Sequence, residues 1–134
     1  MKTRNGWVSN SSSSSFVIFG TKIEESDINK EKLFDMAVEA LPGLKKISRE
    51  EAIKDLEDEY RNNVASLLDE VSYYSDFNSF HDDYVIYVGG CPSNIKEDET
   101  LRQFKERATK AINSILNKEI KPENLTYIEE VIYN

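Results

Sequence analysis

Three short hydrophobic segments constrain the fold of this chain more than any other feature. Residues 16–19 (FVIF) and 84–88 (YVIYV) are apolar throughout and rich in aromatic and β-branched side chains. Runs of this kind are typical of strands buried on both faces, and glycines close both of them. Residues 126–133 make up the third segment, and we predict that they form a final strand.

Between these strands, apolar residues recur at the spacing of one helix face. We predict a helix from Asp27 to Leu41, ended by the pair Pro42-Gly43, because proline and glycine commonly follow helices. A second helix is predicted over residues 48–71. A third begins at about residue 98.

The predicted second helix has the clearest signals. Ser48 and Glu51 form a capping box at its start. A continuous helix from there to Val71 would be about 35 Å long. Its apolar stripe contains Leu56 and Leu67, which we expect to be buried. The stripe of the last helix starts with Leu101 and Phe104, and Phe104 is also expected in the core.

The segment order is β-α-α-β-α-β, which predicts an α/β (or α+β) fold with a small mixed or parallel sheet covered by helices. Residues 73–80 are aromatic but aperiodic, so we expect a loop that folds over the core. The chain of 134 residues suits one compact domain. We predict a serine-rich leader at residues 1–15, followed by a single domain at residues 16–134.

One segment carries the whole net charge of −8. Residues 48–83 contain eleven acidic and three basic side chains, whereas the rest of the chain balances to zero. Such a segment repels a phosphate backbone and attracts a basic protein surface. We therefore expect a partner protein with a basic surface and no direct binding to nucleic acid. The expected contacts on the acidic helix are Asp55, Asp58, Glu59 and Asn62.

The distribution of apolar residues argues against a membrane protein. No apolar stretch approaches the ~20 residues that span a bilayer. Serines follow the basic N-terminal residues, where an export signal needs an apolar core. The single cysteine, Cys91, fits a reducing compartment. These features predict a cytoplasmic protein that does not associate with membranes.

The sequence offers little for catalysis or metal binding. His81 and Cys91 flank one predicted strand, which would place them ~30 Å apart, too far for a catalytic dyad. One histidine and one cysteine cannot supply the usual zinc ligands. The acidic residues around His81 lack the spacing of a calcium loop. We predict no catalytic residue, no metal and no cofactor.

A ligand-binding loop is predicted as an alternative after the strand at residues 84–88. Such a loop leads toward a helix N-terminus, where α/β folds often bind anions. It lacks a P-loop lysine and the GxGxxG spacing, and the acidic run at residues 97–99 would repel phosphate. A plain strand-to-helix turn is the competing interpretation. The candidate residues are Gly89, Gly90, Cys91, Ser93 and Asn94.

The serine run at residues 11–15 has apolar residues on both sides, Trp7 and Val8 before it and Phe16 after it. Small hydroxyl side chains between two apolar anchors suit an extended backbone that lies close against another surface. That surface could belong to this domain or to a partner. A flexible polar leader is the alternative. The candidate contact residues are Trp7, Ser9, Asn10, Ser11, Ser12, Ser13, Ser14 and Ser15.

Residues 2–19 (KTRNGWVSNSSSSSFVIF) resemble the leader of a group of small, mostly uncharacterised proteins of bacteriophages and prophages. Gly6, Val8 and the run from Ser9 to Phe16 carry the match, and Trp7 stands where phenylalanine is more common. A weaker similarity covers residues 98–105 and 127–130. The resemblance implies a viral origin, a place in the infected host cell or the virion, and a specific role for the leader. It implies no mechanism.

Three functions follow from these features as hypotheses. The first is a non-catalytic phage or prophage accessory protein that binds another protein through its leader and its acidic helix. The second is a nucleic-acid mimic, whose acidic helix would occupy the basic groove of a host nuclease, polymerase or defence complex. The third is a small enzyme with a site at the loop of residues 89–94. The sequence indicates no oligomeric state.

Overall fold

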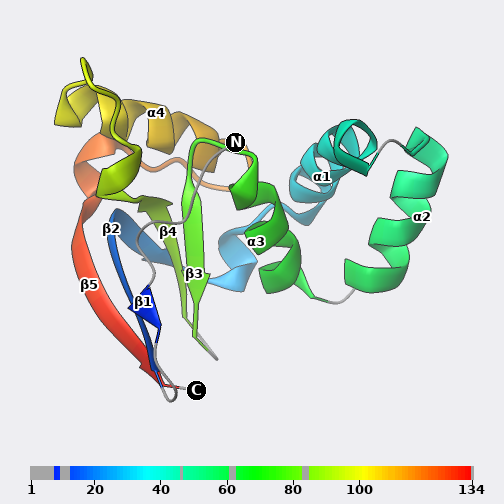
Figure 1. Cartoon of the computed structure of the whole chain (residues 1–134), viewed down its shortest axis with the longest axis horizontal. Coiled ribbons are helices and arrows are strands. Elements are labelled where there is room, and N and C mark those ends of the chain that lie inside the picture. Colours follow the sequence, from blue (N-terminus) through cyan, green and yellow to red (C-terminus); the bar gives the residue numbers. More distant parts are fainter. Residues whose placement is uncertain (1–7, 10–12, 46, 61–62, 83–84, 134) are drawn as a thin grey trace.

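The longest strand, β2 (Ser13–Ile23), lies inside a five-stranded sheet, and both of its edges are paired. The computed structural model describes residues 8–9, 13–45, 47–60, 63–82 and 85–133. One edge of β2 pairs with β5 (Thr126–Tyr133). The other edge pairs first with β1 (Val8–Ser9) and further along with β4 (Ile86–Gly90). Next to β4 lies β3 (Asn78–His81) (Figure 1).

Every pair of strands in the sheet is antiparallel. The predicted class is therefore confirmed in its α+β form, whereas the expectation of a parallel or mixed sheet is wrong. One reason is β3, which overlaps the segment of residues 73–80 that the sequence predicted to be a loop. A short connection joins β3 to β4, and such a connection permits only antiparallel pairing.

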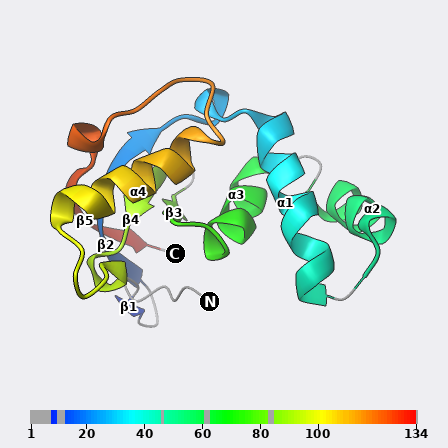
Figure 2. The same cartoon turned by 90° about the horizontal axis from the view of Figure 1, so that it is seen from above.

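In the described part of the chain, four α-helices lie over one face and along one side of this sheet (Figure 2). The last helix lies across β2 and β4, and the third lies beside β3. The first helix packs on the third, and the second packs on the first at the end of the molecule farthest from β5 (Figure 1). Their bounds are α1 Lys30–Lys45, α2 Arg49–Tyr60, α3 Val64–Tyr73 and α4 Leu101–Asn113. No helix in the described part of the chain is long and apolar enough to cross a membrane.

The predicted continuous helix over residues 48–71 is wrong, because the chain forms α2 and α3 there. Asn63 caps the start of α3: its side-chain oxygen accepts a hydrogen bond from the Ser66 amide at 3.0 Å. Asparagine at this position satisfies a backbone N–H that a continuous helix would have paired internally. The predicted cap of α2 is present, because Ser48 Oγ accepts a bond from the Glu51 amide at 3.2 Å.

Both ends of α1 differ from the prediction. Asp27 belongs to a 3₁₀ turn at Glu25–Asp27, and Asn29 accepts the hydrogen bond from the Lys32 amide at the start of the helix. At the other end, the helix continues through the Pro42-Gly43 pair to Lys45. Proline keeps a helical φ, so it removes one backbone hydrogen bond without forcing the chain to turn.

The core has two parts, one on each face of the sheet. The larger part lies between the sheet and the helices and includes Leu56 and Leu67, which are 1% and 5% exposed. Phe104, the third residue expected to be buried, is 1% exposed. The smaller part contains Phe16 and Phe80, whose rings stack with centroids 4.5 Å apart. Leu101, predicted to belong to the stripe of α4, is exposed.

Glycines allow β2 and β4 to approach each other closely. Gly20 lies directly opposite Gly89, and a Cβ at Gly89 would collide with the Phe19 carbonyl oxygen and lie 2.5 Å from Gly20 Cα. The next residue, Gly90, leaves the space that the ring of Phe104 occupies. The predicted strand at residues 84–88 therefore extends through both glycines instead of ending before them.

A partly buried ion pair between Arg107 and Glu99 connects α4 to the segments around it. The Arg107 guanidinium donates from Nε and Nη2 to both carboxylate oxygens of Glu99, at 3.0 and 2.8 Å. It also donates from Nη1 to Asp76 at 3.0 Å and from Nη2 to the Asn94 carbonyl at 3.1 Å. The hydrogen bonds from Arg107 hold the pKa of Glu99 at about 2, below its usual value of 4.5.

This pair predicts acid-dependent stability. A carboxyl group whose pKa is lowered by folding stabilises the folded state fully above its unfolded pKa, and the contribution is lost as the pH falls from about 4.5 to about 2. Urea unfolding across this range should therefore show a steeper loss of stability for the native chain than for Arg107→Gln. The control is Arg102→Gln, because Arg102 forms an exposed pair with Glu106. Equal pH profiles for the native chain and Arg107→Gln would contradict the prediction.

Candidate functional site

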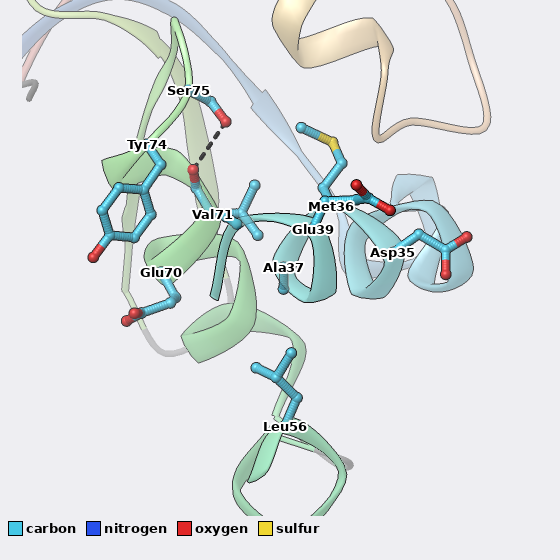
Figure 3. Close-up of a pocket in the computed structure, with 10 residues that line it drawn as sticks. Asp35, Met36, Ala37, Glu39, Leu56, Glu70, Val71, Tyr74 and Ser75 are labelled. Atoms are coloured by element: carbon cyan, nitrogen blue, oxygen red, sulfur yellow. Dashed lines mark hydrogen bonds between the residues drawn. The ribbon is translucent and has the colours of Figure 1, made fainter. Parts of the chain in front are cut away.

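The described part of the chain contains an apolar hollow between α1, α2 and α3, which we call the helical groove. Its volume is about 390 Å³, within the range of sites that bind small molecules or single side chains. In Figure 3, Leu56 points upward from α2 and Val71 lies on the side of α3 that faces α1, whereas the ring of Tyr74 points away from α1. The lining residues are Asp35, Met36, Ala37, Glu39, Ala40, Leu56, Glu70, Val71, Tyr74 and Ser75.

Small side chains on α1 leave this space open. Ala37 and Ala40 are one helical turn apart, nearly in line on α1, and each extends only one carbon from the backbone. The floor of the groove comes from longer side chains, Leu56 on α2 and Val71 on α3. Because Leu56 is 1% exposed and Val71 is 4% exposed, both also belong to the core, and the floor of the groove is held in place by packing.

The rim of the groove is acidic. Asp35 and Glu39 come from α1 and Glu70 comes from α3, and no lysine or arginine is among the lining residues that the structure describes. Arg49 reaches Glu39 from outside, with Nη1 3.0 Å from Oε1, but both side chains are more than 60% exposed. An exposed pair of this kind contributes little and exchanges easily for another partner.

Tyr74 brings a phenol to the α3 side of the groove. Loss of solvation raises the pKa of Tyr74 above 10, and the negative charge of Glu70 adds to the effect. The hydroxyl therefore stays neutral at physiological pH and can donate a hydrogen bond. The ring of Tyr73 meets that of Tyr74 edge-on, with centroids 5.5 Å apart. Both rings are exposed, at 36% and 43%.

The chemistry of the groove suits a ligand with an apolar body and a positive charge. The floor would bury methylene or aromatic groups, and the carboxylates on the rim would face an ammonium or guanidinium group. Lysine and arginine side chains have this composition, with a long apolar stem and a charged head. Tyr74 adds a ring over which a cation can lie.

The structure places part of the serine leader inside the sheet. Ser13, Ser14 and Ser15 belong to β2, where Ser14 lies opposite Ser9 of β1 and opposite Ile132 of β5. The boundary expected between residues 15 and 16 therefore falls within a strand. The predicted contact residues Trp7, Asn10, Ser11 and Ser12 lie outside the described residues. That the leader contacts a partner stays a prediction.

The acidic helix of the prediction corresponds to α2. Asp55 and Asp58 are both exposed there, on the outer side of a helix that buries Ala52 and Leu56 against its neighbours. Glu59 is part of α2, but its side chain falls outside the described part of the chain, and so does Asn62. The exposed acidic side chains that the structure describes on α2 are Glu50, Glu51, Asp55, Glu57 and Asp58.

The predicted ligand loop lies in a different setting from the one expected. Gly89 and Gly90 are buried in β4, which is antiparallel to its neighbours, and Cys91 is 0% exposed. Ser93 and Asn94 belong to a 3₁₀ turn, and Asn94 Nδ2 lies 3.3 Å from the Asn78 side-chain oxygen. The expected site at the carboxyl end of a parallel strand is therefore absent from this part of the sheet.

His81 and Cys91 lie at opposite ends of the β3–β4 pair, as expected, but closer together than a fully extended segment would place them. His81 lies opposite Ile86. Ile86 and Cys91 are five residues apart along β4, which corresponds to about 17 Å in an extended strand. In the described part of the chain, no three histidine, cysteine or acidic residues are grouped to hold a metal ion.

The helical groove does not follow from the sequence pattern. Its residues come from three helices, and the pattern predicts two of these as one continuous helix. The signal that was available is the pair Asn62-Asn63, since asparagine favours helix caps over helix interiors. A break at that pair folds α3 back beside α1, which brings Tyr74 and Val71 toward Met36.

Comparisons with known proteins add no family to this description. No protein-family model, no curated protein and no solved structure matches the chain.

Proposed function

We propose that this chain is a non-catalytic binding protein whose helical groove takes a basic side chain from a partner protein. The observation that carries the proposal is the combination in one groove of a floor formed by Leu56 and Val71 with a rim formed by Asp35, Glu39 and Glu70. An apolar floor alone would accept many ligands. The carboxylates select those that carry positive charge.

The exposed carboxylates of α2 extend the same preference beyond the groove. Asp55 and Asp58 lie on the helix that contributes Leu56 to the floor. A basic protein surface that approaches α2 is attracted before contact, because charges interact over about 8–10 Å at physiological salt. The resemblance of the leader to phage and prophage proteins supports, within the proposal, an activity in an infected host cell or a virion.

A synthetic peptide tests the proposal on the full chain. The probe is an amphipathic peptide with a central arginine flanked by leucines, and its affinity is measured by calorimetry. The double variant Asp35→Lys/Glu70→Lys should weaken binding about tenfold, and binding to the native chain should weaken as salt rises. Ala40→Phe should abolish binding, because the phenylalanine ring would fill the groove. An affinity unchanged by both variants would overturn the proposal.

Two controls separate the groove from general charge and from misfolding. Glu97→Lys/Glu119→Lys changes the net charge by the same amount at exposed positions outside the residues lining the groove, and it should reduce affinity less than twofold. An unchanged thermal unfolding midpoint of Ala40→Phe shows that the loss of binding comes from the filled groove.

The acidic face of α2 supports a second candidate, a nucleic-acid mimic. Five exposed carboxylates follow one another along this helix, opposed by Arg49 and Lys54. A mimic would place them in the basic groove of a nucleic-acid-binding protein. Partners captured by the full chain decide between the two candidates: double-stranded DNA should release the target of a mimic, and Asp55→Lys/Asp58→Lys should prevent its capture. A partner held through the helical groove should be displaced by the basic peptide instead.

A further inference from the structure

The outer edge of β5 has the properties of a site for strand pairing. β5 pairs with β2 along all eight of its residues in a continuous register, from Thr126 opposite Gly20 to Tyr133 opposite Ser13. Among the described residues, no strand pairs with the other edge of β5, which lies at the margin of the sheet (Figures 1 and 2). A long regular edge offers a row of unpaired backbone N–H and C=O groups.

Proteins commonly protect such edges with proline, a bulge or charged side chains, especially lysine. β5 contains no proline and no lysine, and its register has no bulge. The only charged side chains in β5 are the adjacent Glu129 and Glu130 at its middle, both exposed. These two glutamates determine which strands can pair with the edge.

Exposed apolar side chains flank Glu129 on one face of β5. Tyr127 is 58% exposed and Val131 is 46% exposed, and both point to the same face as Glu129 because side chains alternate along a strand. The Tyr127 hydroxyl donates to Glu129 Oε2 at 3.2 Å. Glu130 points to the opposite face, near Tyr87, whose pKa it helps to raise after the larger effect of lost solvation.

The positions of the glutamates disfavour a second copy of this chain as the occupant. In an antiparallel pairing of two β5 strands about a twofold axis, the registers that use most of the strand place Glu129 opposite Glu129 or Glu130 opposite Glu130. Like charges directly opposite each other destabilise a strand pair. Opposite charges stabilise a strand pair. In a partner strand with two adjacent basic residues, the two side chains point to opposite faces of the sheet, so that one lies opposite Glu129 and the other opposite Glu130.

We propose that the outer edge of β5 binds an extended segment of a partner protein, with adjacent lysine or arginine residues opposite Glu129 and Glu130 and apolar residues beside Tyr127 and Val131. The backbone hydrogen bonds supply affinity, and the two glutamates supply selectivity. This surface is separate from the helical groove, because β5 lies at one margin of the molecule and the helices that line the groove lie at the other (Figure 1).

Hydrogen exchange on the full chain tests the proposal. The probe is a peptide with two central lysines flanked on each side by alternating valine and threonine. In the free chain, alternate amides from Thr126 to Tyr133 should exchange rapidly, because their N–H groups point away from β2. With the peptide bound they should become protected. The same peptide with two central glutamates should protect them far less.

The charge-reversed variant Glu129→Lys/Glu130→Lys should weaken binding of the lysine peptide about tenfold and strengthen binding of the glutamate peptide. The matched control Glu97→Lys/Glu119→Lys changes the net charge equally at exposed positions outside β5 and should leave both affinities within twofold. Absence of protection by the lysine peptide would overturn the proposal. Slow exchange in the free chain together with a dimeric mass would replace it with pairing between two copies.

Discussion

Replacing Gly89 with alanine is expected to cost more than about 4 kcal/mol of folding stability, a large fraction of the total stability of a domain. The added Cβ would collide with the Phe19 carbonyl oxygen and lie 2.5 Å from Gly20 Cα. Both are backbone atoms of the central strand, so no side-chain rotation can relieve the clash. β2 and β4 would have to separate where they pair. Circular dichroism during thermal unfolding measures the effect.

Gly90→Ala is the matched comparison one residue along the same strand. A Cβ at Gly90 would meet the tip of the Phe104 ring instead of a backbone atom. The double variant Gly90→Ala/Phe104→Leu should therefore be more stable than Gly90→Ala, whereas Phe104→Leu should not rescue Gly89→Ala. A native-like unfolding midpoint for Gly89→Ala would show that β2 and β4 lie farther apart than described.

Phe104→Ala is expected to destabilise the chain by about 3–5 kcal/mol. The ring is 1% exposed, lies against Gly90 of β4, and has the Arg107 guanidinium 5.4 Å from its centre. Its removal leaves a cavity between α4 and a strand that has no side chain at that position to fill it. The free energy of unfolding in urea measures the loss.

Leu101→Ala provides the control on the same helix. Leu101 is 42% exposed, so its truncation should change stability by no more than about 0.5 kcal/mol. Similar losses for the two variants would mean that α4 is rotated about its axis relative to the sheet. A loss for Leu101→Ala alone would place that side chain in the core.

The strands and helices that the sequence predicted well are those whose apolar pattern is long and regular. β5 spans residues 126–133 as expected, and the buried positions of α4 repeat at helical spacing from Phe104 to Ile112. Leu101 was misplaced because periodicity alone does not show where a helix starts. The start is marked by Thr100 and Gln103, whose reciprocal capping bonds are 2.9 and 3.1 Å long.

β3 could not be found from its pattern. Its residues Asn78 and Ser79 are buried at 1% and 2% exposure, although polar residues usually mark loops. An oxygen of each side chain is paired inside the fold: Asn78 Oδ1 accepts from the Cys91 amide, and Ser79 donates to Ser72. These partners lie outside β3, on α3 and just after β4, so the tertiary structure overrides the local preference.

The two candidate sites also differ in how far the sequence alone predicts them. The exposure of Asp55 and Asp58 follows from the acidic pattern of one helix, and the structure agrees with it. The helical groove depends on how α1, α2 and α3 approach one another, and on the small volume of Ala37 and Ala40 at their meeting point. No local pattern encodes a hollow of this kind, because each of its walls is an ordinary helix face.

The separation in sequence between β2 and β5 also affects how fast the sheet can form. About a hundred residues separate the two strands even at their nearest pair, Gly20 opposite Thr126. During synthesis, β2 leaves the ribosome long before β5 exists, and ribosomes add roughly 5–20 residues per second. Until β5 has been synthesised, which takes several seconds, β2 can therefore form strand pairs only on the edge that faces β4. The aggregation risk of the nascent chain is concentrated in the apolar segment at residues 16–19, and closing so long a loop makes the final pairing a slow step.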